Sequence, residues 1–128
     1  MEPKKVLVVE DEKLLRTVLG KRLEKDGIST MTAADGKEGL EFALQHRPDL
    51  ILLDIMMPHS GTDMLINLRK NEEYGKSARV IFLSNLNPDS DQIVKVIEEQ
   101  EPIFYLVKAN WTLDQIAEKV REVLENKE

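Results

Sequence analysis

Apolar and polar residues follow two recurring patterns along the chain, and the first is a short uninterrupted apolar run. Such runs lie at residues 6–9 and 50–53, and they are typical of strands buried on both faces of a parallel sheet. Residues 28–33 instead alternate apolar and hydroxyl side chains, which predicts a more exposed strand near a sheet edge. Residues 79–83 and 103–107 complete a predicted set of five strands.

The second pattern is a helical period, in which apolar residues recur every three or four positions. The first four expected helices cover roughly residues 12–26, a short stretch around 40–44, a stretch reaching about 70 and another that begins at Asn87-Pro88. Gly27 is expected to cap the first helix, and Pro48 to close off the second. Asp35-Gly36 is interpreted as a turn. Each predicted strand is therefore followed by a predicted helix.

The last helix has the clearest start signal. Thr112 and Gln115 are the outer residues of a capping box, in which each side chain bonds the other residue's backbone N–H. Trp111 and Ile116 stand at the two positions of a hydrophobic staple around the helix start. A continuous apolar stripe then comprises Leu113, Ile116, Ala117, Val120, Val123 and Leu124. This pattern predicts a helix that packs firmly against the sheet.

Five strand–helix units in succession predict an α/β fold with a parallel sheet and helices on both faces, because the crossovers between parallel strands are right-handed. The first and third strands are the most apolar and the second is the most polar. This favours a doubly wound sheet in the order 2-1-3-4-5, whose carboxyl-end switch point lies between strands 1 and 3. No break in composition divides the chain, so we expect one domain over residues 1–128.

Composition and charge exclude several classes of function. The net charge is −6 with no basic patch, which argues against direct nucleic-acid binding. There are no cysteines, which excludes disulfides and thiolate chemistry. The charged start of the chain does not fit a secretory signal, and no apolar run approaches the ~18 residues of a membrane span. We therefore expect a cytoplasmic protein without membrane insertion.

Polar side chains follow the predicted strands at their carboxyl ends. Glu10 and Asp11 follow the first strand, Asp54 the third, Ser84 the fourth and Lys108 the fifth. Carboxylates that meet at one sheet edge repel one another, and a divalent cation relieves that repulsion. Because the set has oxygen ligands and neither histidine nor cysteine, Mg²⁺ is the expected ion.

The same side chains suit phosphoryl transfer, which depends mainly on positioning and charge neutralisation. Asp54 is the candidate nucleophile, Lys108 can neutralise a phosphoryl oxygen, and Ser84 can donate a hydrogen bond to another. Each residue also has an ordinary structural interpretation, as a helix cap, a solvated strand end or a surface lysine. Such separate interpretations leave unexplained why suitable polar residues occur at the carboxyl ends of four different strands.

Four motifs in this order resemble the receiver domain of two-component response regulators, of the chemotaxis-receiver type, from end to end. They are Val-Val-Glu-Asp-Glu at 8–12, Leu-Leu-Asp-Ile-Met-Met-Pro at 52–58 with Gly61 beyond, Ser84 after an apolar strand, and Tyr-Leu-Val-Lys at 105–108. The resemblance implies a flavodoxin-like (βα)5 fold. Receivers are themselves a standard example of the 2-1-3-4-5 order, so the order is not an independent argument for the family.

The resemblance also implies a metal and a phosphate site. Asp54 resembles the phosphoacceptor, which is charged from a phosphohistidine on a sensor histidine kinase or phosphotransfer protein. Glu10 and Asp11 resemble the acidic pair that holds Mg²⁺ together with Asp54, and the backbone carbonyl of Met56 matches a further ligand. Lys108 resembles the invariant lysine of the family.

A switch is implied as well. Ser84 resembles the hydroxyl residue that is drawn to the phosphoryl group, and Tyr105 the aromatic residue that then turns inward. The surface of the fourth helix, the fifth strand and the fifth helix would change shape, which biases a two-state equilibrium toward an output partner that the sequence does not name. The chain is not expected to be an enzyme beyond catalysing its own phosphorylation and dephosphorylation.

The chain departs from the family pattern at three places. Ala109 follows Lys108 where receivers usually have a proline with a cis peptide, so the loop is expected to be either trans with the lysine aimed differently or cis at a cost of ~3 kcal/mol. Asn85 replaces a small residue after Ser84, and we expect it to slow self-dephosphorylation by hindering access. Residues 100–102 replace a usual Gly-Ala corner.

Three other functions compete with this interpretation. A receiver-like module that binds its partner constitutively is supported by Ala109 and Asn85. An aspartyl-phosphate hydrolase usually carries a second aspartate two residues after the nucleophile, where this chain has Met56. A flavodoxin-type cofactor binder would need a phosphate loop after the first strand, where Glu10 and Asp11 would repel the flavin phosphate.

Overall fold

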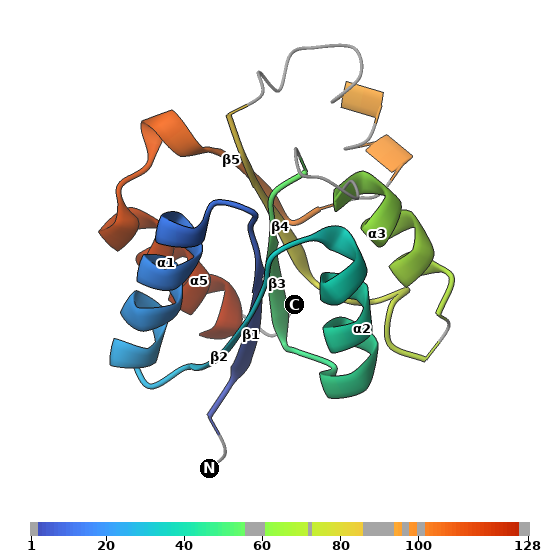
Figure 1. The fold of residues 1–128 in the computed structure, drawn as a ribbon, viewed down its shortest axis with the longest axis horizontal. Coiled ribbons are helices and arrows are strands. Elements are labelled where there is room, and N and C mark those ends of the chain that lie inside the picture. The colour runs from blue at the N-terminus through green and yellow to red at the C-terminus, as the bar shows by residue number, and fades with distance from the viewer. Residues whose placement is uncertain are drawn as a thin grey trace.

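The computed structural model describes residues 3–55, 61–71, 73–85, 94, 95, 98, 99 and 102–125. Its centre is a five-stranded parallel sheet in the order β2-β1-β3-β4-β5. Figure 1 shows α1 and α5 on one face of the sheet and α2 and α3 on the other. The predicted α/β class and the predicted strand order are both confirmed.

The elements are β1 (Lys5–Val9), α1 (Lys13–Lys25), β2 (Ser29–Ala33), α2 (Gly36–His46), β3 (Leu50–Leu53), α3 (Gly61–Arg69), β4 (Val80–Ser84), β5 (Phe104–Val107), the 3-10 turn η1 (Lys108–Asn110) and α5 (Leu113–Glu125). Most of the expected helix from Asn87-Pro88 and most of the corner at 100–102 lie outside the described residues, but residues 94, 95, 98 and 99 are described and are helical, as predicted. The helix labels therefore pass from α3 to α5.

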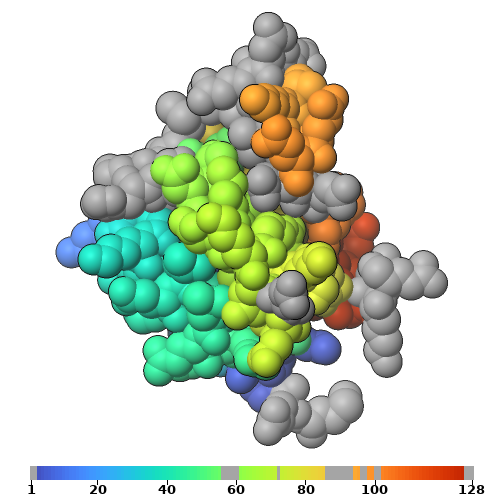
Figure 2. Space-filling model, turned by 90° about the vertical axis from the view of Figure 1, so that its right-hand side faces the viewer, coloured from blue at the N-terminus to red at the C-terminus, as the bar shows by residue number. Residues whose placement is uncertain are grey.

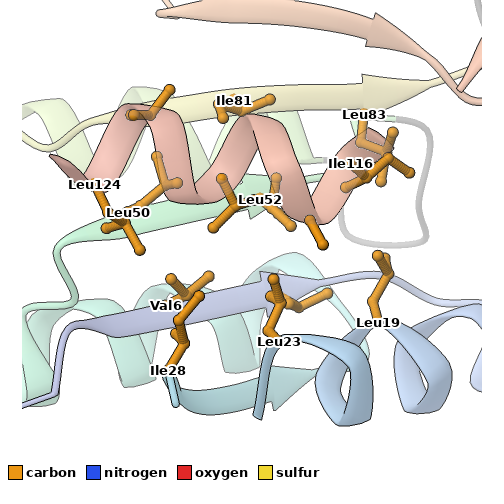
Figure 3. Close-up of a cluster of buried hydrophobic side chains, with 14 of the residues drawn as sticks. Val6, Leu19, Leu23, Ile28, Leu50, Leu52, Ile81, Leu83, Ile116 and Leu124 are labelled. Carbon is orange, nitrogen blue, oxygen red and sulfur yellow. The ribbon is translucent and has the colours of Figure 1, made fainter. Parts of the chain in front are cut away.

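One core lies between the sheet and the pair α1 and α5. Figure 3 shows Val6, Leu50 and Leu52 from the strands in one apolar cluster with Leu23 of α1 and Ile116 of α5. The apolar stripe predicted for the last helix is buried at its Ile116, Ala117, Val120, Val123 and Leu124 positions. This face fixes α1, and with it the loop that follows β1.

A second core lies under α2 and α3, which pack side by side in the view of Figure 2. The sequence pattern is less accurate here. Leu44 and Ile66 belong to the apolar residues that mark these two helices, yet they are 37% and 38% exposed. Both helices are short, and their contacts with the sheet come mainly from residues such as Ala43, Leu65 and Leu68, which are buried.

The helix ends explain where each helix begins and stops. Gly27 adopts a positive φ of 82° just beyond α1, as its predicted capping role requires. The Thr112 and Gln115 side chains bond each other's backbone N–H groups at 3.1 and 2.8 Å, which confirms the capping box. Asp35, interpreted as part of a turn, instead caps α2: its side chain accepts a hydrogen bond from the Glu38 N–H at 2.9 Å.

Candidate functional site at the carboxyl edge of the sheet

The ends of β1 and β3 place two acids side by side at the upper edge of the sheet in Figure 1. Val9 pairs with Leu53, and the backbone N–H of Asp54 donates to the Val9 carbonyl at 3.0 Å. On the other side of β1, the Glu10 N–H donates to the Ala33 carbonyl at 3.0 Å. The sheet therefore continues one residue past the assigned strands and bonds the backbone N–H of both acids.

Both acids are buried. Glu10 is 1% exposed and Asp54 is 4% exposed. A buried carboxylate is costly unless it is paired. The Lys108 ammonium supplies that pairing, since its Nζ lies 2.5 Å from Glu10 Oε1 and 3.0 Å from Asp54 Oδ2. One lysine from the end of β5 thus bridges acids from the ends of β1 and β3.

Lys108 reaches the acids although Ala109 follows it. The Lys108–Ala109 peptide bond is trans, and the chain continues in η1. The expectation that a trans loop would aim the lysine elsewhere is wrong, because the 3-10 turn begins at Lys108 itself and leaves its side chain on the site. Burial lowers the pKa of Lys108, but its contacts with Glu10 and Asp54 outweigh that effect and raise the pKa overall.

Asp11 adds a third carboxylate, which is exposed. One oxygen each from Glu10, Asp11 and Asp54 lies within 4.8 Å of the others. Burial, with smaller contributions from Asp11 and Asp54, raises the pKa of Glu10 to about 7 against the opposing hydrogen bonds from Lys108 and the Glu12 N–H. The cluster thus holds more negative charge than Lys108 alone neutralises.

These three carboxylates fit a hard divalent cation. They offer oxygen ligands at mutual distances that one ion could span, and Asp11 opens toward solvent, where water would complete the coordination. The carbonyl of Met56, the further ligand that the family resemblance implies, lies outside the described residues.

Ser84 and Tyr105 lie next to the acids on β4 and β5. Ser84 is fully buried, and its hydroxyl shares a hydrogen bond with the half-buried Tyr105 hydroxyl. Burial raises the pKa of Tyr105. The charge of Asp54 adds to this rise, and the hydrogen bond with Ser84 opposes it. The Tyr105 ring also meets Phe82 edge-on at 6.1 Å. Tyr105 therefore already faces inward here, whereas the expected switch brings it inward only after phosphorylation.

Two further residues support the site, and neither was predicted to do so from the sequence. Gly61, which belongs to the second motif, packs its Cα against the backbone that follows β3: a Cβ there would lie 2.4 Å from the Asp54 carbonyl oxygen. Arg16 of α1 is a polar position of the helical period, and its guanidinium donates to the carbonyls of Glu10 and Asp11. A glycine within three residues of a motif proline is the one signal that could have identified the first.

A cavity of about 380 Å³ opens beside Lys108. Its lining residues are Glu12, Leu15, Val18, Asn85, Lys108, Ala109, Trp111, Leu113 and Ile116. Asn85 therefore lines this cavity together with Lys108, and it is exposed.

The fold and this edge define a class: a flavodoxin-like α/β protein with three carboxylates and one lysine gathered at the switch point of its sheet. Residues 6–121 match the family described as the response regulator receiver domain. The chain belongs to this family. It is a two-component response regulator receiver domain, as the sequence motifs indicated.

Curated relatives agree with the family assignment. The chain is 33% identical over 125 residues to the probable transcriptional regulator ycf27 of Porphyridium aerugineum, a match that covers 97% of this chain and 49% of that protein. It is 33% identical over 84 residues to sporulation initiation phosphotransferase F of Bacillus subtilis, which covers 66% of each. The chain spans about half, or less, of the length of the transcriptional regulators that it matches.

Solved structures share the fold. The receiver domain of Francisella response regulator 1452 is 31% identical with a TM-score of 0.82, covering 98% of this chain and 99% of that one. The Vibrio cholerae chemotaxis protein CheY4 is 25% identical with a TM-score of 0.83, covering 94% and 98%. None of the helices in the described part of this chain is long and apolar enough to cross a membrane.

Proposed function

We propose that the chain receives a phosphoryl group on Asp54 from a phosphohistidine of a sensor histidine kinase or phosphotransfer protein, in the cytoplasm and with Mg²⁺ bound. One observation carries the proposal. The Lys108 ammonium lies 3.0 Å from Asp54 within a cluster of three carboxylates, at the edge where such sheets bind ligands. A merely structural edge has no need of three acids around one lysine.

The transfer is a displacement at phosphorus. A carboxylate oxygen of Asp54 attacks phosphorus, and the P–O bond forms as the P–N bond to the donor imidazole breaks. The donor ring carries a proton on its other nitrogen, so it takes the electron pair of the P–N bond and leaves as neutral imidazole. Mg²⁺ would be held by Glu10, Asp11 and Asp54, and it would supply charge neutralisation for the incoming oxygens. Lys108, already beside Asp54, binds a phosphoryl oxygen and limits the change in net charge at the buried edge.

The switch follows from the bond between Ser84 and Tyr105. When Asp54 carries a phosphoryl group, the Ser84 hydroxyl donates to one of the phosphoryl oxygens. The present hydrogen bond between the Ser84 and Tyr105 hydroxyls is then lost. Tyr105 then takes a new position along β5, at the edge of the sheet. At this edge the Lys119 ammonium of α5 lies 4.3 Å from the centroid of the Phe104 ring, in cation–π contact. Phosphorylation thus changes the β5–α5 surface by rearranging an inward tyrosine, and an output partner recognises the changed surface.

The chain acts on its own Asp54 and on no external substrate. The constitutive binding module remains the second candidate, and its support has narrowed. Two residues favoured the constitutive module, Ala109 and Asn85. Because Lys108 contacts both acids although Ala109 follows it, only Asn85 still supports that module.

Treatment with phosphoramidate and Mg²⁺ followed by intact-mass measurement tests the proposal. We expect the wild-type chain to gain one phosphoryl group, and Asp54→Asn to gain none. Asp63→Asn, which changes an exposed acid on α3, should behave as the wild type. No gain by the wild type, or an equal gain by Asp54→Asn, would favour the constitutive module.

A further inference from the structure

Arg16 lies on the second turn of α1 and reaches back over the start of its own helix. Its Nη1 donates to the Glu10 carbonyl at 2.8 Å and lies 3.3 Å from the Asp11 carbonyl. One guanidinium nitrogen thus contacts the main chain of both residues in the acid pair. The side chain is half-buried, which keeps it in this position more firmly than a fully exposed arginine would be kept.

The loop between β1 and α1 has few other restraints on its helix side. Within the described part of the chain, no side chain caps α1 at Glu12. The Glu12 N–H instead donates to Glu10 Oε2 at 3.0 Å, while Glu10 Oε1 contacts Lys108. The direction of both Glu10 oxygens therefore depends on how the backbone of residues 10–12 is held, and Arg16 is the side chain that holds it from the helix.

We infer that Arg16 is a positioning residue for the cation site: it fixes the carbonyls of Glu10 and Asp11 so that their carboxylates converge with that of Asp54. The inference rests on the proposed Mg²⁺ role of these acids. The side-chain contacts of Arg16 are with the carbonyls of Glu10 and Asp11, so the proposed effect on the site acts through the acid pair.

Positioning and simple charge predict opposite results when Arg16 is removed. A positive charge near a cation site repels Mg²⁺, so losing it would tighten Mg²⁺ binding if charge were the whole effect. Losing a group that orients the ligands instead weakens binding, typically ~10-fold or more. The half-exposed guanidinium is screened by water, so we expect the orienting effect to dominate.

The experiment is a Mg²⁺ titration of the metal-free full chain. Trp111 is the single tryptophan, and it lines the cavity that Glu12 and Lys108 also line, so its fluorescence can report binding, with calorimetry as a second readout. We expect Arg16→Met to raise the Mg²⁺ dissociation constant ~10-fold and Arg16→Lys, which keeps the charge and a donor, to recover part of that loss.

Arg22→Met is the matched control, because Arg22 lies on the same helix and pairs with Asp26 and Asp114 rather than with the loop. It should change the dissociation constant by less than ~2-fold, since it leaves the ligand geometry intact. If it weakened Mg²⁺ binding as much as Arg16→Met does, the effect would belong to helix stability and the inference would be wrong.

Amide hydrogen exchange of Glu12 provides a readout without metal. We expect this amide to exchange faster in Arg16→Met, because its bond to Glu10 depends on the held loop. Unchanged exchange together with unchanged or tighter Mg²⁺ binding in Arg16→Met overturns the inference and leaves the proposed function intact. Failure of the wild type to bind Mg²⁺ overturns both.

Discussion

The two edges of the sheet treat polar groups in opposite ways. At the amino edge, cationic and hydroxyl side chains bond neutral carbonyls: Arg79 Nη1 donates to the Val123 carbonyl at 2.8 Å, and the Tyr74 hydroxyl to the Pro48 carbonyl at 2.7 Å. At the carboxyl edge, three carboxylates crowd around Lys108. The hydrogen bonds at the amino edge satisfy the groups that they join, whereas the carboxyl edge keeps an excess of negative charge. Such an uncompensated arrangement indicates a ligand-binding site.

The largest effect that would sharpen this comparison is expected at Gly61. The Gly61→Ala side chain would lie 2.4 Å from the Asp54 carbonyl and 2.9 Å from Ile55 Cα, so backbone at the site must move. We expect a loss of about 3 kcal/mol in the free energy of unfolding and the loss of Asp54 phosphorylation. Urea denaturation and intact mass after phosphoramidate treatment measure the two effects.

Gly20→Ala is the control for that change. Gly20 lies within α1, and an added Cβ would meet only the Thr32 and Thr30 methyl groups, at 3.4 and 3.9 Å. This variant should be as stable as the wild type or up to ~1 kcal/mol more stable. Full phosphorylation of Gly61→Ala would show that the Asp54 backbone tolerates displacement.

Arg79→Met tests the amino edge. Its guanidinium joins β4 to the end of α5 and, through Nε, to the Asp49 carbonyl at 3.3 Å. Removing these bonds should cost about 1–3 kcal/mol of stability, because buried carbonyls lose their donor. Phosphorylation of Asp54 under saturating phosphoramidate should proceed as in the wild type. A phosphorylation defect larger than the stability loss explains would couple the two edges and break the comparison.

Tyr74 gives the amino edge a pH dependence. Burial and the charge of Asp49 raise its pKa above that of a free tyrosine, although Arg69 opposes them. The unfolded chain therefore loses the phenolic proton first, so the stabilisation is complete below pH ~10 and falls as the pH rises further. Tyr74→Phe should lose ~1 kcal/mol at pH 8 and show a weaker decline between pH 9.5 and 11.

Urea unfolding across that pH range measures both curves. Equal declines for the wild type and Tyr74→Phe would mean that other groups dominate the alkaline loss of stability.

The smallest effect is expected at Asn85, on the rim of the carboxyl edge. Shortening it in Asn85→Ala should open access for the water that attacks the aspartyl phosphate, and we expect self-dephosphorylation to become a few-fold faster, equivalent to ~1 kcal/mol or less in the barrier. The decay of the phosphorylated mass with time measures the rate. A variant that loses phosphate no faster would show that Asn85 does not obstruct the site.

The sequence predicted best what depends on local pattern. The apolar runs placed β1 and β3 inside the sheet, and the residues just after them, Glu10 and Asp54, therefore had to meet at one edge. The Thr112 capping box was visible because all its partners lie within four residues. The same holds for Gly27, whose position after a helical period marks a helix end.

What the sequence could not predict depends on side chains that cross between elements. Arg16 bonds two carbonyls that precede its helix, and Tyr105 bonds Ser84 on the neighbouring strand. Lys108 contacts the acids although the peptide bond that follows it is trans. None of these follows from periodicity, since each is fixed by three-dimensional proximity. Leu44 and Ile66 fit the helical period and are nevertheless exposed, because short helices contact the sheet over a narrow stripe.

The free energy of unfolding with and without Mg²⁺ tests the central claim most directly, which is that the carboxyl edge is built to hold a cation. At a Mg²⁺ concentration 100 times the dissociation constant, we predict that the wild-type chain gains about 2.7 kcal/mol, and that Asp11→Asn gains far less at the same concentration. A wild-type chain whose stability does not respond to Mg²⁺, or an equal gain in Asp11→Asn, would contradict the account.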